Sequence, residues 1–424
     1  MGARKVPGGA LAVVKDGRLV YTRGYGWADR EGKAAVRPAS LFRIASISKP
    51  FTAVAVMKLV ETGRLDLNAR ALDLLTSGRE SLSFDKAKLD ERWRRITVRH
   101  LLQHTAGWDR DKSFDPMFRP REIARTLNVT SPPQPRDVIR YMLAQPLDFD
   151  PGTRYAYSNF GYCVLGRVIE NIAGTGYESF VRKTVLATAG IKRMRVGASL
   201  EGGRAQDEVR YYVAHDEMAE SVFDGFPSTR ASLKGNGSGA RRSRATGGGP
   251  DKGSAVSSSA PERREPQEEG KRVPWPYGGF CLESMDAHGG WIASAIDLAR
   301  FAAALRDPDH SPLLKPKTMR MMQAPPEAPV SRNADGSLAD HYYGCGWLVR
   351  PVGNEGKANY WHSGSLPGTS TLLVRRHDGV SWAVLFNQRS DDRQLPDGEI
   401  DPALHRAADA VMDWPEVDLF RKFP

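Results

Sequence analysis

Strand-like patterns occupy both ends of this chain, and helical patterns fill the region between them. Near the N-terminus, GALAVVKDGRLVYTRGYGWAD has two runs rich in β-branched and aromatic residues on either side of Asp16-Gly17, which predicts a β-hairpin. Near the C-terminus, YGCGWLVRP, ANYWHSG, STLLVRRHD and VSWAVLFNQ are further strand-like runs, and His377-Asp378-Gly379 predicts a turn between the last two. We therefore predict an α+β fold: one antiparallel sheet, flanked by helices and built from both chain ends, with a mostly helical domain inserted into it.

This pattern divides the 424 residues into three parts. Residues 1–62 and 274–424 form the predicted sheet domain, in which Ser294 and Asp297 make an S-x-x-D cap before a helix. Residues 63–226 form the predicted helical domain, with ITVRHLLQHTAGW, PRDVIRYMLAQ and SNFGYCVLGRVIENIAG as its clearest helices. Residues 227–273 are rich in Gly, Ser and Arg and contain almost nothing to bury, which predicts a disordered low-complexity insertion.

Composition limits the class of protein. The hydrophobic fraction of 40% and the charged fraction of 26% are typical of a soluble globular protein. No apolar run approaches the ~20 residues that a membrane-spanning helix needs. The N-terminus, MGARKVPGGALAVV, lacks the apolar core and cleavage site of a secretory signal. We therefore expect a cytoplasmic location by default, with a leader missing from the N-terminus as the alternative.

The net charge of +11 raises the question of nucleic acid. The stretch from residue 230 to residue 272 has ten Lys or Arg and five Asp or Glu, so it alone supplies +5. The rest is modestly basic and shows no basic stripe interleaved with aromatic residues. We expect no nucleic-acid partner.

Cysteine and histidine spacing gives no metal or disulfide pattern. Cys163, Cys281 and Cys345 are odd in number and form no C-x-x-C pair, so we expect buried free thiols. His100 and His104 have i,i+4 spacing, but no acidic residue lies between them, which favours a structural role over a metal site. The sequence predicts neither a metal nor a cofactor, and it does not indicate an oligomeric state.

A first motif with chemical meaning is RIASISKP, in which Ser46 and Lys49 are three residues apart before an amphipathic pattern. On a helix, residues i and i+3 share a face. Burial would disfavour the charged form of Lys49 and lower its pKa, which would make it a base for the Ser46 hydroxyl. The alternative is a capping serine with a surface lysine. The same spacing recurs at Ser83 and Lys86, which we interpret as loop or helix-cap residues.

A second motif is YAYSNFGY, in which Tyr157 and Asn159 precede a predicted helix. In an extended or turn backbone, residues i and i+2 point the same way, so both side chains could reach one pocket. A phenol near a lysine ammonium is expected to have a depressed pKa and to shuttle protons. The alternative is a core tyrosine with Asn159 as a helix cap.

A third motif is YWHSGSLPG, which carries His362, Gly364 and Ser365 at the end of a predicted strand. Glycine allows close approach of a substrate, and a backbone N–H at a strand edge can donate to an oxyanion. The alternative is a strand end with a glycine-rich turn, and H-x-G also recurs at His288 and Gly290.

The order of the three motifs resembles the serine β-lactamase and penicillin-binding-protein superfamily. S-x-x-K comes first, Y-x-N follows about a hundred residues later, and H-[ST]-G stands near the C-terminus. The segments SLFRIASISKPFTAVAVMKLVETGRLDL, TVRHLLQHTAGW, DPGTRYAYSNFGYCVLGRVIE and HGGWIASAIDLARF are similar to those of the family as well. The most similar groups are class C β-lactamases, family VIII esterases, D-aminopeptidases and β-lactamase-like proteins.

The resemblance implies a β-lactamase/transpeptidase-like fold and a serine hydrolase. Ser46 would be acylated, Lys49 and Tyr157 would share the proton transfers, and Asn159 would hold Lys49 and the acyl group. The oxyanion would be bound by the backbone N–H groups of Ser46 and Ser365. The partner would be a small-molecule or peptide substrate.

Two departures from the family refine this expectation. Classical β-lactamases have lysine where this chain has His362, and histidine is largely neutral at pH 7. This favours carboxylic esters or small amides and peptides over β-lactams. Members also begin with a helix that packs on the sheet, and this chain starts just after it. The alternatives are β-lactamase or D-Ala carboxypeptidase activity, or a weakly catalytic scaffold that retains the fold.

Overall fold

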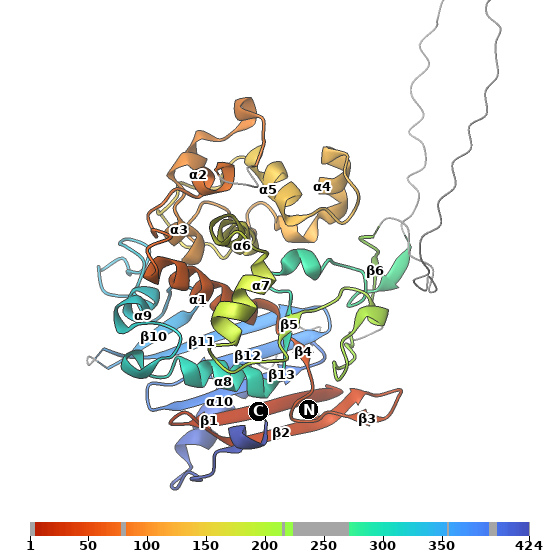
Figure 1. Cartoon of the computed structure of the whole chain (residues 1–424), viewed down its shortest axis with the longest axis vertical. Coiled ribbons are helices and arrows are strands. Elements are labelled where there is room, and N and C mark those ends of the chain that lie inside the picture. Colours follow the sequence, from red (N-terminus) through yellow and green to blue (C-terminus); the bar gives the residue numbers. More distant parts are fainter. Residues whose placement is uncertain are drawn as a thin grey trace, which may run out of the picture.

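An eight-stranded antiparallel sheet joins the two ends of the chain (Figure 1). The computed structural model describes residues 5–77, 82–213, 217–223, 271–353, 356–389 and 397–423. The strand order is β3-β2-β1-β13-β12-β11-β10-β9. These strands are β1 (Gly8–Lys15), β2 (Arg18–Asp29), β3 (Ala34–Ala35), β9 (Tyr342–Tyr343), β10 (Leu348–Val352), β11 (Lys357–Leu366), β12 (Thr369–Arg375) and β13 (Val380–Phe386). The predicted α+β fold, with a sheet assembled from both ends, is confirmed.

The two predicted hairpin turns lie where the sequence places them. Asp16 and Gly17 both have positive φ, as the tight turn between β1 and β2 requires. Gly379, with φ of 83°, ends the turn between β12 and β13. The central pairing joins β1 to β13, with Ala12 opposite Ala383.

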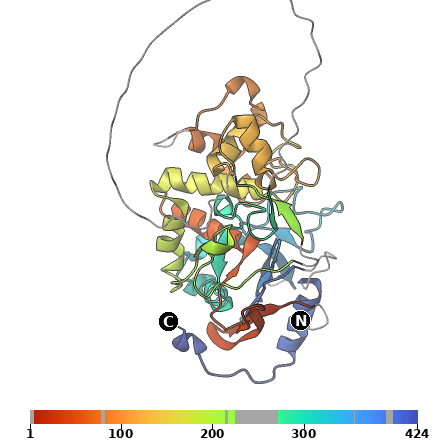
Figure 2. The same ribbon diagram turned by 90° about the vertical axis from the view of Figure 1, so that its right-hand side faces the viewer.

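Helices cover both faces of the sheet (Figure 2). On one face, small buried residues of β1 such as Ala10 and Ala12 belong to the main core, which also contains α1 (Ser48–Glu61) and α8 (Ala295–Ala304). On the other face, Trp382 and Val384 of β13 form a smaller core against α10 (Asp397–Asp409). The predicted S-x-x-D cap of α8 is present, because Ser294 and Asp297 form a reciprocal capping box.

The remaining helices lie mostly above α1, on the side of the molecule away from β1 and β2 (Figure 1). They are α2 (Ala71–Thr76), α3 (Val98–Leu102), α4 (Pro120–Leu127), α5 (Pro135–Leu143), α6 (Asn159–Ala173), α7 (Tyr177–Val181) and α9 (Pro316–Gln323). The helix predicted in ITVRHLLQHTAGW is shorter than its pattern, because α3 ends at Leu102 and the chain turns at His104 with φ of 57°.

Two small sheets connect parts of the chain that the sequence analysis places in different domains. One has the order β4-β8-β5, from Phe42–Arg43, Trp291–Ala293 and Arg195–Val196. The other pairs β6 (Met218–Glu220) with β7 (Arg272–Pro274). Residues 272 and 273 of the predicted insertion, 227–273, form strand pairs in β7, and the domain boundaries stay a prediction. Residues 227–270 of that prediction lie outside the described residues.

The cysteine prediction is confirmed, since Cys163, Cys281 and Cys345 are all buried and free. Burial raises the pKa of Cys163 and of Cys345 to about 12, so both thiols stay protonated at neutral pH. In the part of the chain that the structure describes, no helix combines the length and the apolar character needed to cross a bilayer.

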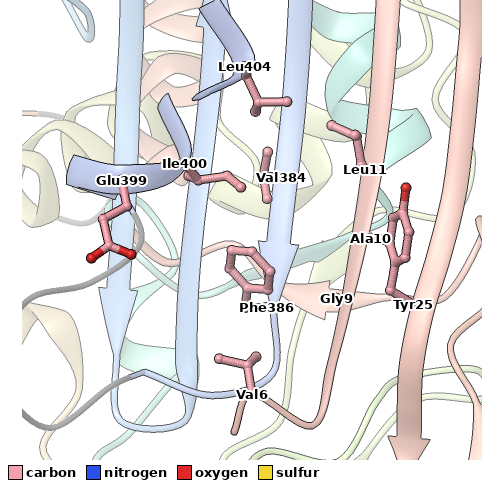
Figure 3. A pocket seen from close by; sticks show the side chains of 10 residues that line it. All are labelled: Val6, Gly9, Ala10, Leu11, Tyr25, Val384, Phe386, Glu399, Ile400 and Leu404. Atoms are coloured by element: carbon pink, nitrogen blue, oxygen red, sulfur yellow. The ribbon is translucent and has the colours of Figure 1, made fainter. Parts of the chain in front are cut away.

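The outer face of the sheet carries a hollow of about 520 Å³ between β1, β13 and α10 (Figure 3). Its wall is largely apolar, with Leu11 and Val384 from the strands and Ile400 and Leu404 from the helix; Glu399 is its one acidic residue. None of the residues of the three sequence motifs lines this hollow. The candidate active site is on the other face.

Candidate active site

Ser46 lies in a short 3₁₀ turn, Ala45–Ile47 (η2), directly before α1. The sequence predicts that the motif opens the helix itself, but α1 begins at Ser48. Ala45 is buried and has a positive φ of 48°, a conformation that costs a non-glycine residue free energy. The surrounding structure therefore holds the residue before Ser46 in a strained geometry.

The turn is held by the strands beneath it. Thr371 on β12 donates from Oγ1 to the carbonyl of Ile44 at 3.0 Å. On β11, a Cβ at Gly364 would come within 2.3 Å of the same carbonyl oxygen. Gly364 is thus required for the close approach of β11 to the turn that carries Ser46, which is a packing role beside the predicted substrate role.

Helix α1 is buried almost all round rather than amphipathic, because the sheet and the other helices enclose it. Lys49, near its start, is 0% exposed. Its Nζ lies 3.0 Å from Ser46 Oγ, 2.8 Å from Asn159 Oδ1 and 2.9 Å from the carbonyl oxygen of His288. The predicted Ser46–Lys49–Asn159 grouping is therefore present in the structure.

The protonation state of Lys49 follows from this burial. Loss of solvent lowers the pKa of Lys49 well below its usual value, while the nearby Asp115 carboxylate opposes that shift. Two of the three oxygens around Nζ, the amide of Asn159 and the carbonyl of His288, can only accept hydrogen bonds. A neutral amine has two N–H groups for these two acceptors, and its lone pair then faces the Ser46 hydroxyl.

Tyr157 stands beside the same serine. The Ser46 side chain acts on the Tyr157 phenol and opposes the rise of its pKa, and Lys49 Nζ lies 4.7 Å from the centre of the phenol ring. The predicted depression of its pKa is wrong: burial raises the pKa of Tyr157, and this effect exceeds that of nearby positive charge. Tyr157 is therefore a protonated phenol at neutral pH.

Asn159 is the first residue of α6 and is buried. The helix cap that the alternative assigned to Asn159 is instead Ser158, whose Oγ accepts from the backbone N–H of Gly161 at 3.1 Å. The side chain of Asn159 is thereby free to reach Lys49. Tyr157 and Asn159 do meet around one lysine, as their i,i+2 spacing predicts.

His362 on β11 is buried, and both of its ring nitrogens have partners in the protein. Nδ1 lies 2.7 Å from the carbonyl oxygen of Ser363, and Nε2 lies 2.9 Å from the hydroxyl of Tyr343. Because a carbonyl only accepts, Nδ1 carries the proton and Nε2 accepts from Tyr343. Burial lowers the pKa of His362 to about 3, so the ring is neutral at pH 7, in agreement with the expected neutrality.

Ser365 lies three residues further along β11, opposite Ser370 of β12, and is exposed. Its predicted role in oxyanion binding concerns only its backbone N–H. That role, like the substrate contact predicted for His362, stays a prediction.

A comparison with known protein families identifies the one to which the chain belongs. A family model described as Beta-lactamase matches residues 1–405 of the chain. The chain belongs to the beta-lactamase family. The resemblance inferred from the motifs is thus confirmed over nearly the whole length.

Two relatives of the chain are 23% and 30% identical to it over the aligned residues. Penicillin-binding protein 4* of Bacillus subtilis (strain 168) is 23% identical over 411 residues, which cover 96% of this chain and 74% of that protein. Protein flp of Staphylococcus aureus (strain COL) is 30% identical over 182 residues, which cover 43% of this chain and 33% of that protein. The chain therefore matches only about a third of the length of protein flp.

Solved structures show the same beta-lactamase-type fold. The octameric penicillin-binding protein homologue from Pyrococcus abyssi has a TM-score of 0.64 at 23% identity, over 96% of this chain and 75% of that one. The D-amino acid amidase from Ochrobactrum anthropi SV3 also has a TM-score of 0.64, at 19% identity over 96% of this chain and 95% of that one.

Sequence reasoning missed a carboxylate in this beta-lactamase-family site. Asp115 accepts from Nδ2 of Asn159 at 2.6 Å and from the backbone N–H of Met117 at 3.1 Å. Burial raises its pKa, and its hydrogen bonds oppose that shift. Because a carboxylate accepts from the amide NH₂, Asp115 fixes the orientation in which Oδ1 of Asn159 faces Lys49. Asp115 precedes Asn159 by 44 residues in a loop, and no motif marks it.

Two histidines also support the site. His104 accepts from the backbone N–H of Ser158 through Nδ1 at 3.2 Å, and the centre of its ring lies 4.4 Å from that of the Tyr157 ring, with the two planes tilted by 41°. The predicted structural role of His104 is therefore specific: it positions the Tyr157–Asn159 segment. His288, which the sequence treats as a chance repeat of H-x-G, contributes its carbonyl to Lys49.

Proposed function

We propose that this protein is a serine hydrolase that forms an acyl-enzyme on Ser46 and acts on carboxylic esters or small amides and peptides. The observation that carries the proposal is the environment of Lys49. Its two fixed acceptors, Asn159 Oδ1 and the His288 carbonyl, leave the amine lone pair for the Ser46 hydroxyl. A base of lowered pKa in contact with a hydroxyl is the arrangement that activates a nucleophile.

The first half of the reaction transfers the acyl group. Ser46 Oγ attacks the substrate carbonyl carbon while its proton passes to Lys49 Nζ. The carbonyl oxygen becomes an oxyanion, which the backbone N–H groups of Ser46 and Ser365 would bind. When the tetrahedral intermediate collapses, the bond to the leaving group breaks and that group takes a proton.

Tyr157 is the proposed donor of that proton. Its raised pKa keeps the phenol protonated at neutral pH, and its ring lies beside Lys49, the residue that contacts Ser46. The resulting phenolate regains a proton from the Lys49 ammonium, 4.7 Å from its ring centre, so the pair returns to its starting state. Water then attacks the acyl-enzyme by the same route in reverse and releases the acid.

The neighbours support acyl chemistry without naming the substrate. The D-amino acid amidase, at 19% identity, is named for amide hydrolysis, which is within the proposed substrate range. The neutral, buried His362 provides no fixed positive charge on β11, which favours esters and small amides over β-lactams.

Covalent labelling tests the proposal. We expect a fluorophosphonate probe to label wild type and the Ser83→Ala variant equally, and to leave Ser46→Ala unlabelled. Wild type should also hydrolyse p-nitrophenyl esters faster than a chromogenic cephalosporin. Labelling that survives Ser46→Ala would exclude Ser46 as the nucleophile, and faster turnover of the cephalosporin would reverse the substrate preference.

A further inference from the structure

Arg110 lies beside Tyr157, although no sequence motif contains it. Its guanidinium carbon is 4.9 Å from the centre of the Tyr157 ring, and the Ser46 side chain acts on the Tyr157 phenol. One aromatic ring therefore separates this cation from the reacting hydroxyl.

The charge of Arg110 acts on the groups around Ser46. Burial lowers the pKa of Lys49 most, and the positive charge of Arg110 adds to that lowering. Burial raises the pKa of Tyr155 to about 12, and Arg110 opposes that rise. Tyr155 is 40% exposed, so the region over which this charge acts includes solvent-accessible surface.

Arg110 is available to bind an anion, whereas comparable arginines are not. Among the described residues, its ion pair is a loose 3.9 Å contact with Asp111, which is itself 91% exposed and weakly held. Arg154 pairs with Asp109 at 2.8 Å, and Arg119 pairs with Glu122 at 3.3 Å. All three arginines lie over aromatic rings and have similar exposure, so pairing is what distinguishes Arg110.

The strand on the other side of the site offers no such charge. His362 is 3% exposed, neutral, and bonded through both ring nitrogens to the protein. An anionic group of a substrate bound at Ser46 would therefore form an ion pair with Arg110 and not with His362. Guanidinium is the side chain best matched to a carboxylate, because its planar N–H groups can donate two parallel hydrogen bonds.

We propose that Arg110 binds a carboxylate of the substrate, and that the preferred substrates of the Ser46 site are therefore esters or amides that carry a free carboxylate. The inference rests on the proposed hydrolase function and makes its substrate class more specific. The carboxylate can belong to the acyl part or to the leaving group, and the two cases require different substrates.

Two matched pairs of esters separate these cases. For the acyl part, mono-p-nitrophenyl glutarate is compared with methyl p-nitrophenyl glutarate. For the leaving group, 4-acetoxybenzoate is compared with methyl 4-acetoxybenzoate. We expect wild type to prefer the charged member of one pair by about 10- to 100-fold in kcat/KM, the range for one hydrogen bond between charged groups. The preference should lie mainly in KM and should shrink at high salt.

Arg110→Gln should bring that ratio to about one, and Arg110→Lys should restore part of it because lysine keeps the charge without the planar fork. Arg119→Gln is the matched control: this arginine has the same kind of ring contact but is neutralised by Glu122, so the ratio should stay at the wild-type value. Thermal unfolding of each variant controls for folding.

A wild-type ratio near one in both pairs, or a ratio that Arg110→Gln leaves intact, overturns the assignment. Calorimetric binding of both members of each pair to Ser46→Ala tests Arg110 without chemistry: tighter binding of the charged member of one pair that Arg110→Gln abolishes supports it, and equal binding in both pairs overturns it. Absence of labelling and of all ester hydrolysis would contradict the proposed function instead, so the two failures can be told apart.

Discussion

The chain contains the tetrapeptide pattern S-x-x-K twice, and the two copies have opposite surroundings. Lys49 is completely buried among three oxygens, and its serine lies in a short turn directly before a helix. Ser83 and Lys86 are both exposed, in a loop and at the start of a short 3₁₀ turn, Lys86–Lys88 (η3). The difference shows that the spacing only places two side chains together. Burial away from water, together with fixed hydrogen-bond partners, is what lets a lysine act as a base.

The largest expected effect distinguishes the two lysines. Lys49→Met should slow acylation by about 10²- to 10⁴-fold, the range for loss of a positioned general base, because Lys49 is the amine that contacts Ser46 among the described residues. Lys86→Met should leave the rate at the wild-type value. Stopped-flow labelling with the fluorophosphonate probe measures both, and equal rates for the two variants would remove the functional difference between the copies.

The second comparison concerns the phenol of Tyr157, which lies beside the buried Lys49. Tyr157→Phe should slow hydrolysis of ethyl esters by about 10²-fold but of p-nitrophenyl esters far less, because p-nitrophenolate leaves without a proton. In wild type, acylation should rise with pH as Lys49 loses its proton, at a pH well below 10.5. Steady-state rates across pH for both ester types measure this, and an equal loss with both leaving groups would argue against Tyr157 as the proton donor.

Two aspartates extend the comparison to the supporting residues. Asp115 and Asp85 both cap 3₁₀ turns by accepting from a backbone N–H two residues on, but only Asp115 also holds Asn159. Asp115→Ala should lower kcat by roughly 10-fold, since the amide of Asn159 loses the partner that fixes its orientation. Asp85→Ala should have no effect on kcat. If Asp115→Ala lowers only the melting temperature and leaves kcat unchanged, Asp115 is a cap and nothing more.

The smallest effect concerns stability in acid. The pKa of His362 is about 3 in the folded protein and ~6.5 when unfolded, so the unfolded state binds the extra proton between these values. Stability is therefore lost as pH falls below 6.5, by about 1.4 kcal/mol per pH unit for this histidine. His362→Gln should flatten that decline in urea unfolding. An unchanged slope in His362→Gln would contradict its buried neutral state.

Much of the fold follows from local patterns. The Asp16-Gly17 turn, the strands β10 to β13 and the S-x-x-D cap of α8 are short-range features, and sequence alone locates them. The small sheet of β4, β8 and β5 could not be predicted, because its strands have two or three residues and pair across long separations.

The candidate site also has a part that the sequence predicts and a part that it does not. Ser46, Lys49, Tyr157 and Asn159 belong to recognisable motifs, and the structure brings them together. Asp115, Arg110 and the carbonyl of His288 could not be found, since a loop residue or a backbone oxygen acquires its role only from the partner that folding brings to it. The pKa of Tyr157 was predicted in the wrong direction because the sequence shows its charged neighbours but not its burial.

The pairing of β1 with β13 has a consequence for synthesis of the protein. The hydrogen bond from Gly8 to Asn387 spans 379 residues, so the inner edge of β1 has no strand to pair with until β13 has been translated. At about 5–20 residues per second, that interval lasts on the order of tens of seconds. The first hairpin then waits on the ribosome with an open edge, the kind of surface that chaperones shield from association with other chains. Because β11 and β12 also support the turn at Ser46, a nascent chain completes the support of that turn only after β11 and β12 have been translated.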